Sequence, residues 1–493
     1  MADLTIAVPL LAERLALGRV DAQVVRTGMG PRRAARAVPA LEGRGPLAVL
    51  GVAGALTHAI RVGDVVVADE VRVGEGSVPC PAAPLVAGAL RRIGLTVHVG
   101  PIVTTDRIGS VSMRRALAAS GAIAVDMESA VLAAAAAGRP FVAVRVISDT
   151  SARGVWHPAI VPNGLRALWT LRRIRPVLTA WAAAATDRHV LVASPRSFCA
   201  GVERAIDIVE RALDRYGAPV YVRRQIVHNA HVVADLEAKG AVFVEECDDV
   251  PEGARMIFAA HGVSPAVRAQ AEARQLSVID ATCPLVAKVH SEVRRYAGTG
   301  HTVFLIGHAD HEEVAGTHGE APERVIVLDD VAAAQAVDVA DPERVAYVMQ
   351  TTLAVDEAGG VASALRERFP RMRAPRQDDI CYATTNRQAA VRDIARDCDL
   401  VLVIGSPNSS NSLRLVEVAQ RSGAASYLVD EASDVELSWL MGARRVGVTA
   451  GASAPPVLVD RVVHALSGLG AVVLTERPTT TEDVTFTLPR EVS

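Results

Sequence analysis

Short apolar runs alternate with longer amphipathic stretches through the first part of the chain. Up to about residue 187 these runs have the length of buried strands, and they lie at residues 5–8, 22–26, 47–51, 65–68, 97–103, 122–125 and 141–146. The stretches between them suit helices. This alternation predicts an α/β layer fold for the first part of the chain.

A second series of units begins near residue 189. Here each apolar run leads into a polar loop, with runs at residues 190–193, 256–259, 278–279, 303–306, 345–349, 400–404 and 446–448. Loops at the carboxyl ends of strands are where open α/β sheets bind ligands. We predict a first domain over residues 1–187 and a second over residues 188–493, the second built from three small α/β lobes around a central cavity.

Composition narrows the functions that this chain can have. Its 493 residues suit two to four domains, and a net charge of −3 with interspersed signs gives no electrostatic footprint for nucleic acid. The chain has two lysines, Lys239 and Lys288, and neither lies in a phosphate-loop motif, which disfavours a P-loop nucleotidase. Irregularly spaced cysteines, no secretory signal and no apolar run of about 20 residues predict a cytoplasmic protein.

Three of the six cysteines share one local setting. Cys199, Cys283 and Cys381 each lie in a polar loop that is followed by an amphipathic helix pattern. A helix N-terminus stabilises negative charge, so a cysteine there is more readily the thiolate that binds metal or attacks carbon. The alternative for each is a small buried residue. Their separations of 84 and 98 residues match no local zinc or ferredoxin pattern, so only the fold can bring them together.

Motifs around these cysteines carry a resemblance to a known family. The matching stretches are Cys199-Ala200-Gly201-Val202, Val227-His228-Asn229, Ala260-His261-Gly262-Val263-Ser264, residues 280–285, His311-Glu312-Glu313-Val314, Gln350-Thr351-Thr352-Leu353, residues 378–388, Asn408-Ser409-Ser410-Asn411-Ser412 and residues 449–455. In this order they resemble the 4-hydroxy-3-methylbut-2-enyl diphosphate reductase (LytB/IspH) family, over about residues 189–493.

The resemblance implies reduction of 4-hydroxy-3-methylbut-2-enyl diphosphate to isopentenyl and dimethylallyl diphosphates, in the methylerythritol phosphate route to isoprenoids. It also implies that Cys199, Cys283 and Cys381 hold a [4Fe–4S] cluster. Three cysteines leave one iron open, and that iron can act as a Lewis acid on the substrate hydroxyl. No flavin or dinucleotide fingerprint is evident in the sequence, so we expect electrons from an external ferredoxin or flavodoxin.

The same resemblance implies a pocket for the substrate's diphosphate. Its donors would be imidazole, hydroxyl and amide groups, those of His228, His261, His311, Ser409, Ser410, Asn411 and Ser453. We expect a bound dianion to keep the imidazoles protonated. Glu313 is expected to deliver protons to the leaving hydroxyl, by way of the phosphate or Thr351. The alternative for Glu313 is a carboxylate that only caps a helix.

Motifs in the first domain lie near the ends of predicted strands. They are Thr27-Gly28-Met29-Gly30-Pro31, a glycine turn at residues 51–54, residues 126–130 at the start of an alanine-rich helix, and Ser148-Asp149. Together they resemble the nucleoside phosphorylase and nucleosidase superfamily. The resemblance implies that ribose is held by Met127 and Glu128. It implies that Asp149 donates a proton to the leaving purine base and that Gly28 and Gly30 expose backbone N–H groups toward phosphate.

The glycine turn at residues 51–54 departs from this superfamily. Residues 49–55 are apolar, whereas many relatives place a phosphate-binding serine or arginine there, so phosphorolysis and hydrolysis both stay open. The apolar turn is similar to the hopanoid-associated phosphorylase branch, whose substrate is a nucleoside attached to a large lipid, as in adenosylhopane. The alternative is a noncatalytic module that assembles the chain into a homo-oligomer.

A remote alternative for the second domain starts from its histidines. His308 and His311 have the i, i+3 spacing of a metal-ligand pair, although the sequence shows no third ligand. This reading predicts a mononuclear metallohydrolase that holds zinc rather than iron and sulfide.

Overall fold

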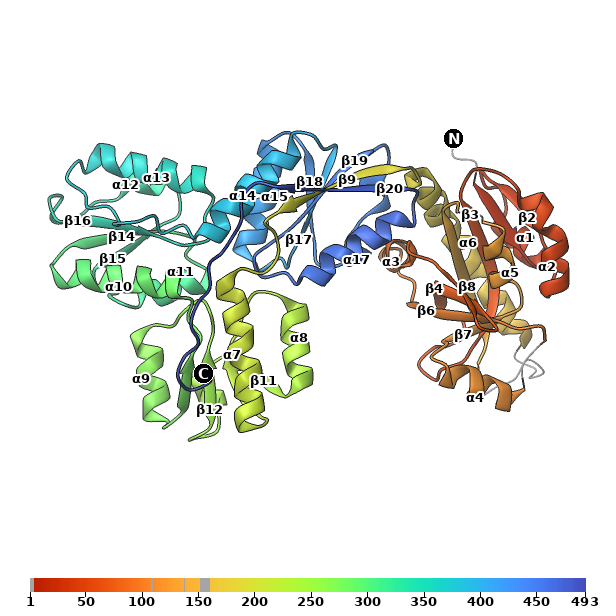
Figure 1. Cartoon of the computed structure of the whole chain (residues 1–493), viewed down its shortest axis with the longest axis horizontal. Coiled ribbons are helices and arrows are strands. Elements are labelled where there is room, and N and C mark those ends of the chain that lie inside the picture. Colours follow the sequence, from red (N-terminus) through yellow and green to blue (C-terminus); the bar gives the residue numbers. More distant parts are fainter. Residues whose placement is uncertain (1–3, 108–109, 137, 151–159) are drawn as a thin grey trace. The chain divides into compact units, whose positions relative to one another are not determined.

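The computed structural model describes residues 4–107, 110–136, 138–150 and 160–493. The chain packs as two compact units (Figure 1). The first unit takes in Met1–Val190, Glu431–Val446 and Asp460–Thr475, and the second takes in Leu191–Asp430, Gly447–Val459 and Glu476–Ser493. The domain boundary after residue 187 stays a prediction, because the first unit also includes two segments from the second half of the chain.

The first unit is built on one eight-stranded sheet. Its strands are β1 (Thr5–Val8), β2 (Gln23–Arg26), β3 (Leu47–Ala55), β4 (Val65–Val73), β5 (Gly76–Pro79), β6 (Val97–Thr104), β7 (Ala124–Asp126) and β8 (Phe141–Asp149). They follow the order β2-β1-β3-β7-β6-β4-β5, and β8 pairs with both β3 and β4. The pairings of β3, β8, β4, β6 and β7 therefore close into a ring. The predicted strands are present; β5, which no apolar pattern indicated, is an exposed partner of β4.

The glycine turn predicted at residues 51–54 is wrong, because these residues continue strand β3. The glycines make room for charged side chains instead of a bend. A Cβ at Gly51 would lie 2.5 Å from Arg145 Nη1 and 2.8 Å from Glu13 Oε1, and a Cβ at Gly54 would lie 3.0 Å from the Arg114 guanidinium. Both glycines are therefore packing positions inside a strand.

Helices surround this sheet. They are α1 (Leu11–Leu17), α2 (Pro31–Ala37), the 3₁₀ turn η1 (Val38–Leu41), α3 (Ala83–Arg92), α4 (Val111–Ala119), α5 (Ser129–Ala134) and α6 (Ile160–Ala184). The start of α5 is fixed by Asp126, whose Oδ2 accepts a hydrogen bond from the Ser129 N–H at 3.1 Å. A helix therefore opens directly after β7, as the motif at residues 126–130 predicted. Long α6 carries the fully buried Trp181.

The rest of the chain forms three sheets. The strands are β9 (Arg188–Ser194), β10 (Val220–Arg223), β11 (Ala241–Val244), β12 (Arg255–Phe258), β13 (Ser277–Asp280), β14 (Thr302–Ile306), β15 (Val325–Leu328), β16 (Val345–Met349), β17 (Leu400–Ile404), β18 (Ala425–Val429), β19 (Arg445–Ala450) and β20 (Val472–Pro478). The sheet orders are β11-β10-β12-β13, β15-β14-β16 and β18-β17-β19-β9-β20. Three α/β lobes are therefore present, as predicted.

Helices cover these sheets, and Figure 1 shows α10 and α11 on one side of the β14-containing sheet with α12 and α13 on the other. They are α7 (Ala200–Tyr216), α8 (Ala230–Lys239), α9 (Pro265–Ala273), α10 (Pro284–Gly298), α11 (Glu312–His318), α12 (Val331–Ala336), α13 (Val355–Arg368), α14 (Tyr382–Ala395), α15 (Ser410–Arg421), α16 (Leu437–Leu440) and α17 (Pro456–Ser467), with 3₁₀ turns η2 (Cys247–Asp249) and η3 (Ala432–Asp434).

Parallel pairing brings distant loops to the same sheet edge. Strands β12 and β13 run parallel with Phe258 opposite Asp280, so the loops that follow them, with His261 and Cys283, leave the sheet side by side. Strands β14 and β16 likewise pair in parallel with Ile306 opposite Met349. The loops toward Glu313 and Thr351 therefore emerge together.

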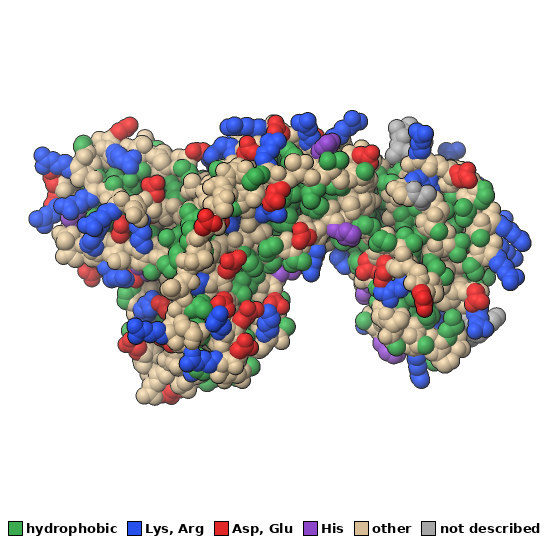
Figure 2. Space-filling model, viewed as in Figure 1, with side chains coloured by type: hydrophobic (Ala, Val, Ile, Leu, Met, Phe, Trp, Pro, Cys, Tyr) green, Lys and Arg blue, Asp and Glu red, His purple; other side chains and the backbone are tan. Residues whose placement is uncertain are grey.

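Charged side chains of both signs are interspersed on the face shown in Figure 2, as the near-zero net charge of the sequence suggests. Within the part of the chain that the structure describes, the helices all fall short of the length and apolar character that a membrane span needs.

Candidate active site

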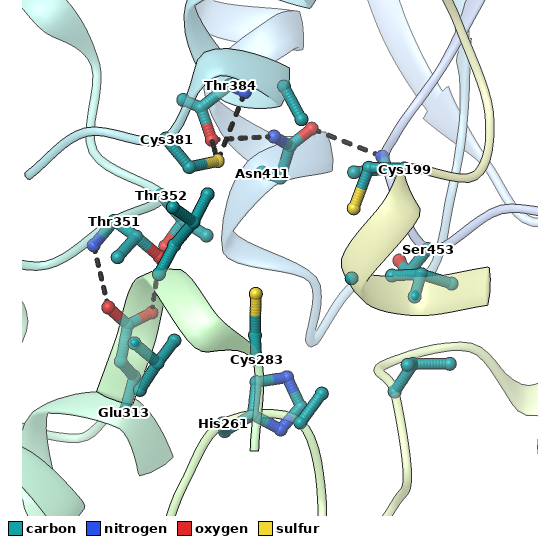
Figure 3. A pocket seen from close by; sticks show the side chains of 18 of the residues that line it. Cys199, His261, Cys283, Glu313, Thr351, Thr352, Cys381, Thr384, Asn411 and Ser453 are labelled. Atoms are coloured by element: carbon teal, nitrogen blue, oxygen red, sulfur yellow. Dashed lines mark hydrogen bonds between the residues drawn. The ribbon is translucent and has the colours of Figure 1, made fainter. Parts of the chain in front are cut away.

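Three cysteines begin three helices around one cavity of the second unit. Cys199 is the N-cap of α7, Cys283 of α10 and Cys381 of α14. All three line the same cavity, and Figure 3 shows their sulfur atoms there. Each helix thus starts at the cavity with the N–H groups that carry the positive end of its dipole. The fold brings together residues that lie 84 and 98 positions apart in the sequence.

The protein environment alone keeps two of these thiols protonated, contrary to the expected thiolates. Burial raises the pKa of Cys283 to about 11 and that of Cys381 to about 12, and the neighbouring Cys199 raises both. The Cys381 sulfur accepts a hydrogen bond from the Thr384 N–H at 3.3 Å, which opposes this only in part. Burial therefore outweighs the helix N-terminus, and a metal that binds here must displace protons.

The donor set fits an iron–sulfur cluster. Sulfur ligands suit such clusters, and these three sulfurs converge on one cavity without forming a disulfide. Gly201 keeps the space beside them clear, because a Cβ there would lie 2.8 Å from the Cys283 sulfur and 3.8 Å from the Cys199 sulfur. A larger residue at position 201 would occupy the space that a metal group needs.

Glu313 and Thr351 form a hydrogen-bonded pair in the cavity wall (Figure 3). The Thr351 N–H donates to Glu313 Oε1 at 2.7 Å, and the Thr351 hydroxyl donates to Oε2 at 3.0 Å. The cap of α11 is supplied by His311, whose Nδ1 accepts from the Glu313 N–H at 3.2 Å. The Glu313 carboxyl is therefore more than a cap. Burial raises its pKa, against the effect of the Thr351 hydrogen bonds, so it tends to hold a proton.

Three histidines form a cluster on the same cavity. His228 and His261 are stacked with ring centroids 4.0 Å apart, and His311 meets them edge-on at 5.5 and 6.0 Å. Burial, with the charge of neighbouring imidazoles, lowers the pKa of His228 to about 2 and that of His311 to about 4. The His228 and His311 imidazoles are neutral in the protein by itself. The expected protonation therefore depends on a bound anion.

Hydroxyl and amide groups complete the wall. Ser453 Oγ donates to the His228 carbonyl at 3.0 Å and contacts Ser409 Oγ at 3.2 Å. Asn411 Nδ2 donates to Thr384 Oγ1 at 3.2 Å, and Thr352 Oγ1 donates to Ser410 Oγ at 3.2 Å. All the predicted diphosphate-binding residues, His228, His261, His311, Ser409, Ser410, Asn411 and Ser453, line this one cavity.

A second possible metal-donor set overlaps the histidine cluster. One ligand atom from each of His228, His261 and Glu312 lies within 4.8 Å of the others. This set does not include the predicted His308–His311 pair. His308 contacts an arginine instead, with its Nε2 2.8 Å from Arg414 Nη2. Glu312 also lies 3.5 Å from Arg224 Nη1, so part of its charge is already balanced.

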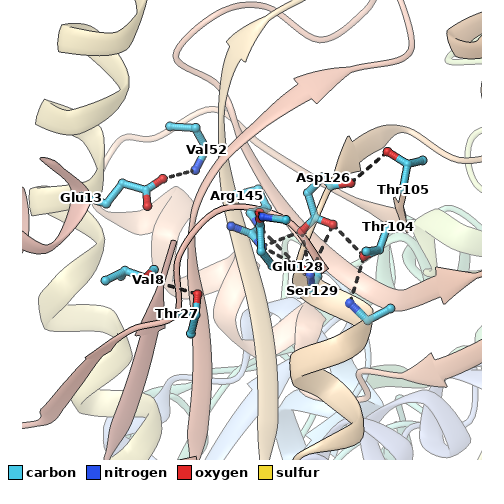
Figure 4. A network of polar contacts seen from close by, with 12 residues as sticks. Val8, Glu13, Thr27, Val52, Thr104, Thr105, Asp126, Glu128, Ser129 and Arg145 are labelled. Carbon is cyan, nitrogen blue, oxygen red and sulfur yellow. Dashed lines mark hydrogen bonds and ion pairs between the residues drawn. The ribbon is translucent and has the colours of Figure 1, made fainter. Parts of the chain in front are cut away.

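The first unit contains a separate polar cavity. Met127, Glu128 and Asp149 line it together, as the sequence predicts for a nucleoside site. Behind them Arg145 is fully buried, with Nη2 2.6 Å from Asp126 Oδ2 and 3.6 Å from Glu128 Oε2 (Figure 4). Burial raises the pKa of Glu128, which Arg145 opposes.

Carboxylates accept hydrogen bonds from backbone N–H groups in both glycine motifs, including Gly30, whose N–H was expected to face phosphate. The Gly30 N–H donates to Glu128 Oε1 at 2.7 Å, and the Val52 N–H donates to Glu13 Oε1 at 2.9 Å. Gly28 has a positive φ of 78°, but neither it nor Gly30 is among the residues that line the described cavity. The structure therefore does not show the predicted exposure of the Gly30 N–H toward phosphate.

Asp149, the predicted acid, is held in an ion pair. Its Oδ2 lies 2.5 Å from Arg114 Nη2, both side chains are buried, and the Ser148 hydroxyl donates to Oδ1 at 3.1 Å. To give a proton to a purine, Asp149 would have to exchange this partner for the base.

The comparisons with known proteins agree with this geometry. Residues 190–467 match the model of the family described as LytB protein, which covers more than half of the chain. The 4-hydroxy-3-methylbut-2-enyl diphosphate reductase of Xanthomonas oryzae pv. oryzae (strain PXO99A) is 55% identical over 309 residues, 62% of this chain and 98% of that protein. The chain belongs to the LytB protein family.

Further likenesses concern both parts of the chain. The reductase of Xanthomonas axonopodis pv. citri (strain 306) is 56% identical over 308 residues, 62% of this chain and 98% of that protein. The solved E-1-hydroxy-2-methyl-but-2-enyl-4-diphosphate reductase from Plasmodium falciparum is 35% identical with a TM-score of 0.60, over 62% of this chain and 97% of that chain. Residues 8–163 match the model of the Phosphorylase superfamily. The LytB part is thus an oxidoreductase, and the predicted fold class is confirmed for both parts.

Several lining residues of the LytB cavity escaped the sequence reasoning. Thr384 and Tyr382 lie within the motif at residues 378–388, which indicated a role only for Cys381; the Tyr382 hydroxyl accepts from the Ala200 N–H at 3.3 Å. Phe486 carries no motif that could have indicated it. In the phosphorylase-like part, Glu13 and Arg114 were missed because each is followed by an arginine in a helix-like stretch, a pattern that looks like an ordinary charged helix face.

Proposed function

We propose that the LytB part reduces 4-hydroxy-3-methylbut-2-enyl diphosphate to isopentenyl and dimethylallyl diphosphates. The convergence of Cys199, Cys283 and Cys381 on one cavity with the Glu313–Thr351 pair carries the proposal. The reaction replaces a C–O bond by a C–H bond, so it consumes two electrons and two protons and releases water. The relatives bear the name of this reductase, which supports the same substrate for this chain.

The three cysteines would hold a [4Fe–4S] cluster. When bound, it would supply the electrons and, at its open iron, the Lewis acid that weakens the C–O bond. The chain's own residues position these ligands: each thiol is fixed at the first turn of a helix, and Thr384 donates to the sulfur of Cys381. Its electrons would come from an external ferredoxin or flavodoxin.

The histidine cluster would hold the substrate's diphosphate. Neutral imidazoles with free nitrogens can either donate as they stand or take a proton when the dianion arrives. Both ring nitrogens of His228 are without a hydrogen-bond partner among the described residues, which leaves them for a ligand. Ser409, Ser410, Asn411 and Ser453 would add neutral donors, so the diphosphate is bound largely without preformed positive charge.

Glu313 would supply the proton that turns the leaving hydroxide into water. Burial raises its pKa, which favours the protonated carboxyl, and the Thr351 hydroxyl gives that proton a hydrogen-bonded route into the cavity. Burial of the pair excludes bulk water from the carboxyl. Proton delivery is thus confined to the substrate's position.

The test uses the full chain, purified and reconstituted with iron and sulfide without oxygen. We expect iron and acid-labile sulfide to remain bound, and a reduced electron donor to convert the diphosphate substrate to both products, detected by chromatography. A protein that binds the cluster but forms neither product would contradict the proposed substrate.

The overlapping set of His228, His261 and Glu312 supports a second candidate, a mononuclear metallohydrolase. Imidazole and carboxylate ligands suit zinc. Metal analysis separates the two candidates, because the reductase requires iron with sulfide at the cysteines, whereas zinc alone would favour the hydrolase.

For the phosphorylase-like part we infer hydrolysis of an N-glycosidic bond. Glu13 and Glu128 occupy the N–H groups of Val52 and Gly30, so a phosphate would meet two carboxylates where it needs donors. Like charges disfavour phosphate in a buried site. Water has no such conflict. Glu128 beside Met127 would hold the ribose, and Asp149 would protonate the leaving base.

Two exposed apolar side chains line this cavity, which supports a nucleoside with a large apolar group such as adenosylhopane. Leu10 and Met29 line the cavity, yet they are 37% and 48% exposed. Side chains of this kind can cover an apolar substituent that extends from the ribose.

The assay incubates the full chain with adenosine, methylthioadenosine and adenosylhopane, with and without phosphate. We expect adenine release that does not depend on phosphate, and its loss in Asp149→Asn. Release only with phosphate would overturn hydrolysis. No release from any substrate would favour a noncatalytic module for homo-oligomer assembly.

A further inference from the structure

Lys288 joins the helix that Cys283 begins to the loop that ends at Cys381. It lies on α10, and its Nζ donates to the carbonyl oxygens of Gln377 at 2.8 Å and Asp378 at 3.1 Å. The same Nζ is 3.2 Å from Asp379 Oδ1. One ammonium group therefore binds three consecutive residues of a segment that is 89 to 91 positions away in the sequence.

Asp379 and Cys381 tie the end of this loop to the end of β16 and the segment that follows it. Asp379 has a side chain that is 0% exposed, and its Oδ2 accepts from the Met349 N–H at 3.0 Å. The Cys381 N–H donates to the Thr351 carbonyl at 3.1 Å. The Asp379 carboxylate thus ties the loop to the end of β16, the Cys381 N–H ties it to residue 351, and Lys288 ties it to α10. Within residues 377–381, the hydrogen bonds and ion pairs to α10 that the structure describes come from Lys288; farther back in the same loop, the Tyr296 hydroxyl of α10 donates to the Ala374 carbonyl at 2.8 Å.

The chemistry of the site calls for lysine. An ammonium group is a point charge with three donors, and here it meets three oxygens around one nitrogen. A guanidinium is planar and spreads its donors over a wider fork, so it cannot reproduce this arrangement. The chain uses 52 basic residues of these two kinds but only two lysines, Lys239 and Lys288. This chain uses arginine at almost all its basic positions. Position 288 is a lysine, which suits the compact arrangement of three oxygens that it binds.

We propose that Lys288 is a positioning residue that fixes the Cys381 thiol relative to the Cys283 thiol and thereby sets how firmly the cysteines hold iron. The inference rests on the proposed role of the three cysteines as iron ligands. Removing the ammonium leaves the buried Asp379 carboxylate without its cation and frees residues 377–379, the part of the loop next to Cys381, from α10. The Cys381 sulfur then loses its fixed distance from the other two sulfurs, and the bound iron is released faster.

The test compares full-chain Lys288→Met and Lys288→Arg with the matched control Lys239→Met. Lys239 lies on α8, is exposed and pairs with Glu210 and Asp235 at the surface. Each reconstituted protein is mixed with an iron chelator without oxygen, and the loss of iron is followed with time. We expect loss about 10-fold faster or more in Lys288→Met, as is typical when residues behind metal ligands are changed. Lys288→Arg should fall between, and Lys239→Met should match the wild type.

A second variant separates positioning from a general loss of folding. Asp379→Asn keeps the shape of the side chain but removes the charge that Lys288 meets. If both residues act through one contact, the double variant loses iron no faster than the worse single variant. Additive effects, or equal iron loss in Lys288→Met and Lys239→Met, would overturn the proposal. Wild-type protein that takes up no iron would instead contradict the cysteine assignment itself.

Discussion

Glu313 shows how one carboxyl gains a catalytic environment from its neighbours. The helix cap that its position suggested is provided by His311, and the carboxyl is instead bound twice by Thr351. Because burial raises its pKa, the group is poised to give up a proton only to a partner that enters the cavity. The sequence placed Glu313 in a motif, but only the fold shows which of its two possible roles the contacts favour.

Replacing Glu313 by glutamine should keep the fold and remove the proton. We expect Glu313→Gln to bind iron and sulfide normally and to lose turnover by about 10²- to 10⁴-fold, the usual contribution of a positioned acid. The measurement is kcat with the reconstituted protein. Glu343→Gln, at a carboxylate that pairs with exposed Arg371, is the control. Near-normal turnover in Glu313→Gln would remove this residue from the mechanism.

The histidine cluster makes diphosphate binding depend on pH. The pKa values of His228 and His311, about 2 and about 4, mean that both rings are neutral before binding. A bound dianion raises these values, so the complex takes up protons and affinity should increase as the pH falls from about 8 to 6. Calorimetry in two buffers with different ionisation enthalpies measures that uptake. Identical binding enthalpies in both buffers would show that the rings bind as neutral donors.

Helix starts organise the site at the scale of elements. Helices α7, α10 and α14 begin at the three cysteines. Helix α8 begins just after His228, with Asn229 as its cap, and α11 is capped by His311. Part of the strand order could be predicted from the apolar pattern, because many units repeat a strand, a loop and an amphipathic helix. Strands β10, β11, β15, β18 and β20 were not predicted. The glycine positions at Gly51 and Gly54 could not be predicted, since the charged side chains that fill the space beside them come from elements far away in the sequence.

Asn229 links a helix cap to the diphosphate pocket. Its buried side chain caps α8 by accepting hydrogen bonds from the His231 and Val232 N–H groups, both at 3.1 Å, and His228 precedes it. We expect Asn229→Ala to lower the free energy of unfolding by about 1–2 kcal/mol and to raise KM for the diphosphate substrate. Urea unfolding and steady-state kinetics measure the two effects.

The control is Asp330→Ala, which removes the exposed cap of α12, where Oδ1 accepts from the Ala333 N–H at 2.7 Å. It should cost similar stability without changing KM. If both variants raise KM equally, the effect of Asn229 would be global rather than local.

At the scale of the whole molecule, the two cavities that carry the candidate sites differ in chemistry. Each is lined by residues of one unit, a sulfur- and imidazole-lined cavity in the second and a carboxylate-rich one in the first. The cysteine separations gave no sign that these thiols meet, and the resemblance to a family supplied that expectation before the fold did. The contact of Lys288 with residues 377–379 had no sequence signal, because it depends on the packing of α10 against a distant loop.

The most direct test of the account is turnover of 4-hydroxy-3-methylbut-2-enyl diphosphate by the reconstituted full chain and by its Cys381→Ser variant. Cys398→Ser, at a cysteine outside the cavity, is the matched control. The account predicts both diphosphate products from the wild type and the control, and an incomplete cluster with no product from Cys381→Ser. Full turnover by Cys381→Ser would contradict the central claim that three converging cysteines hold the catalytic group.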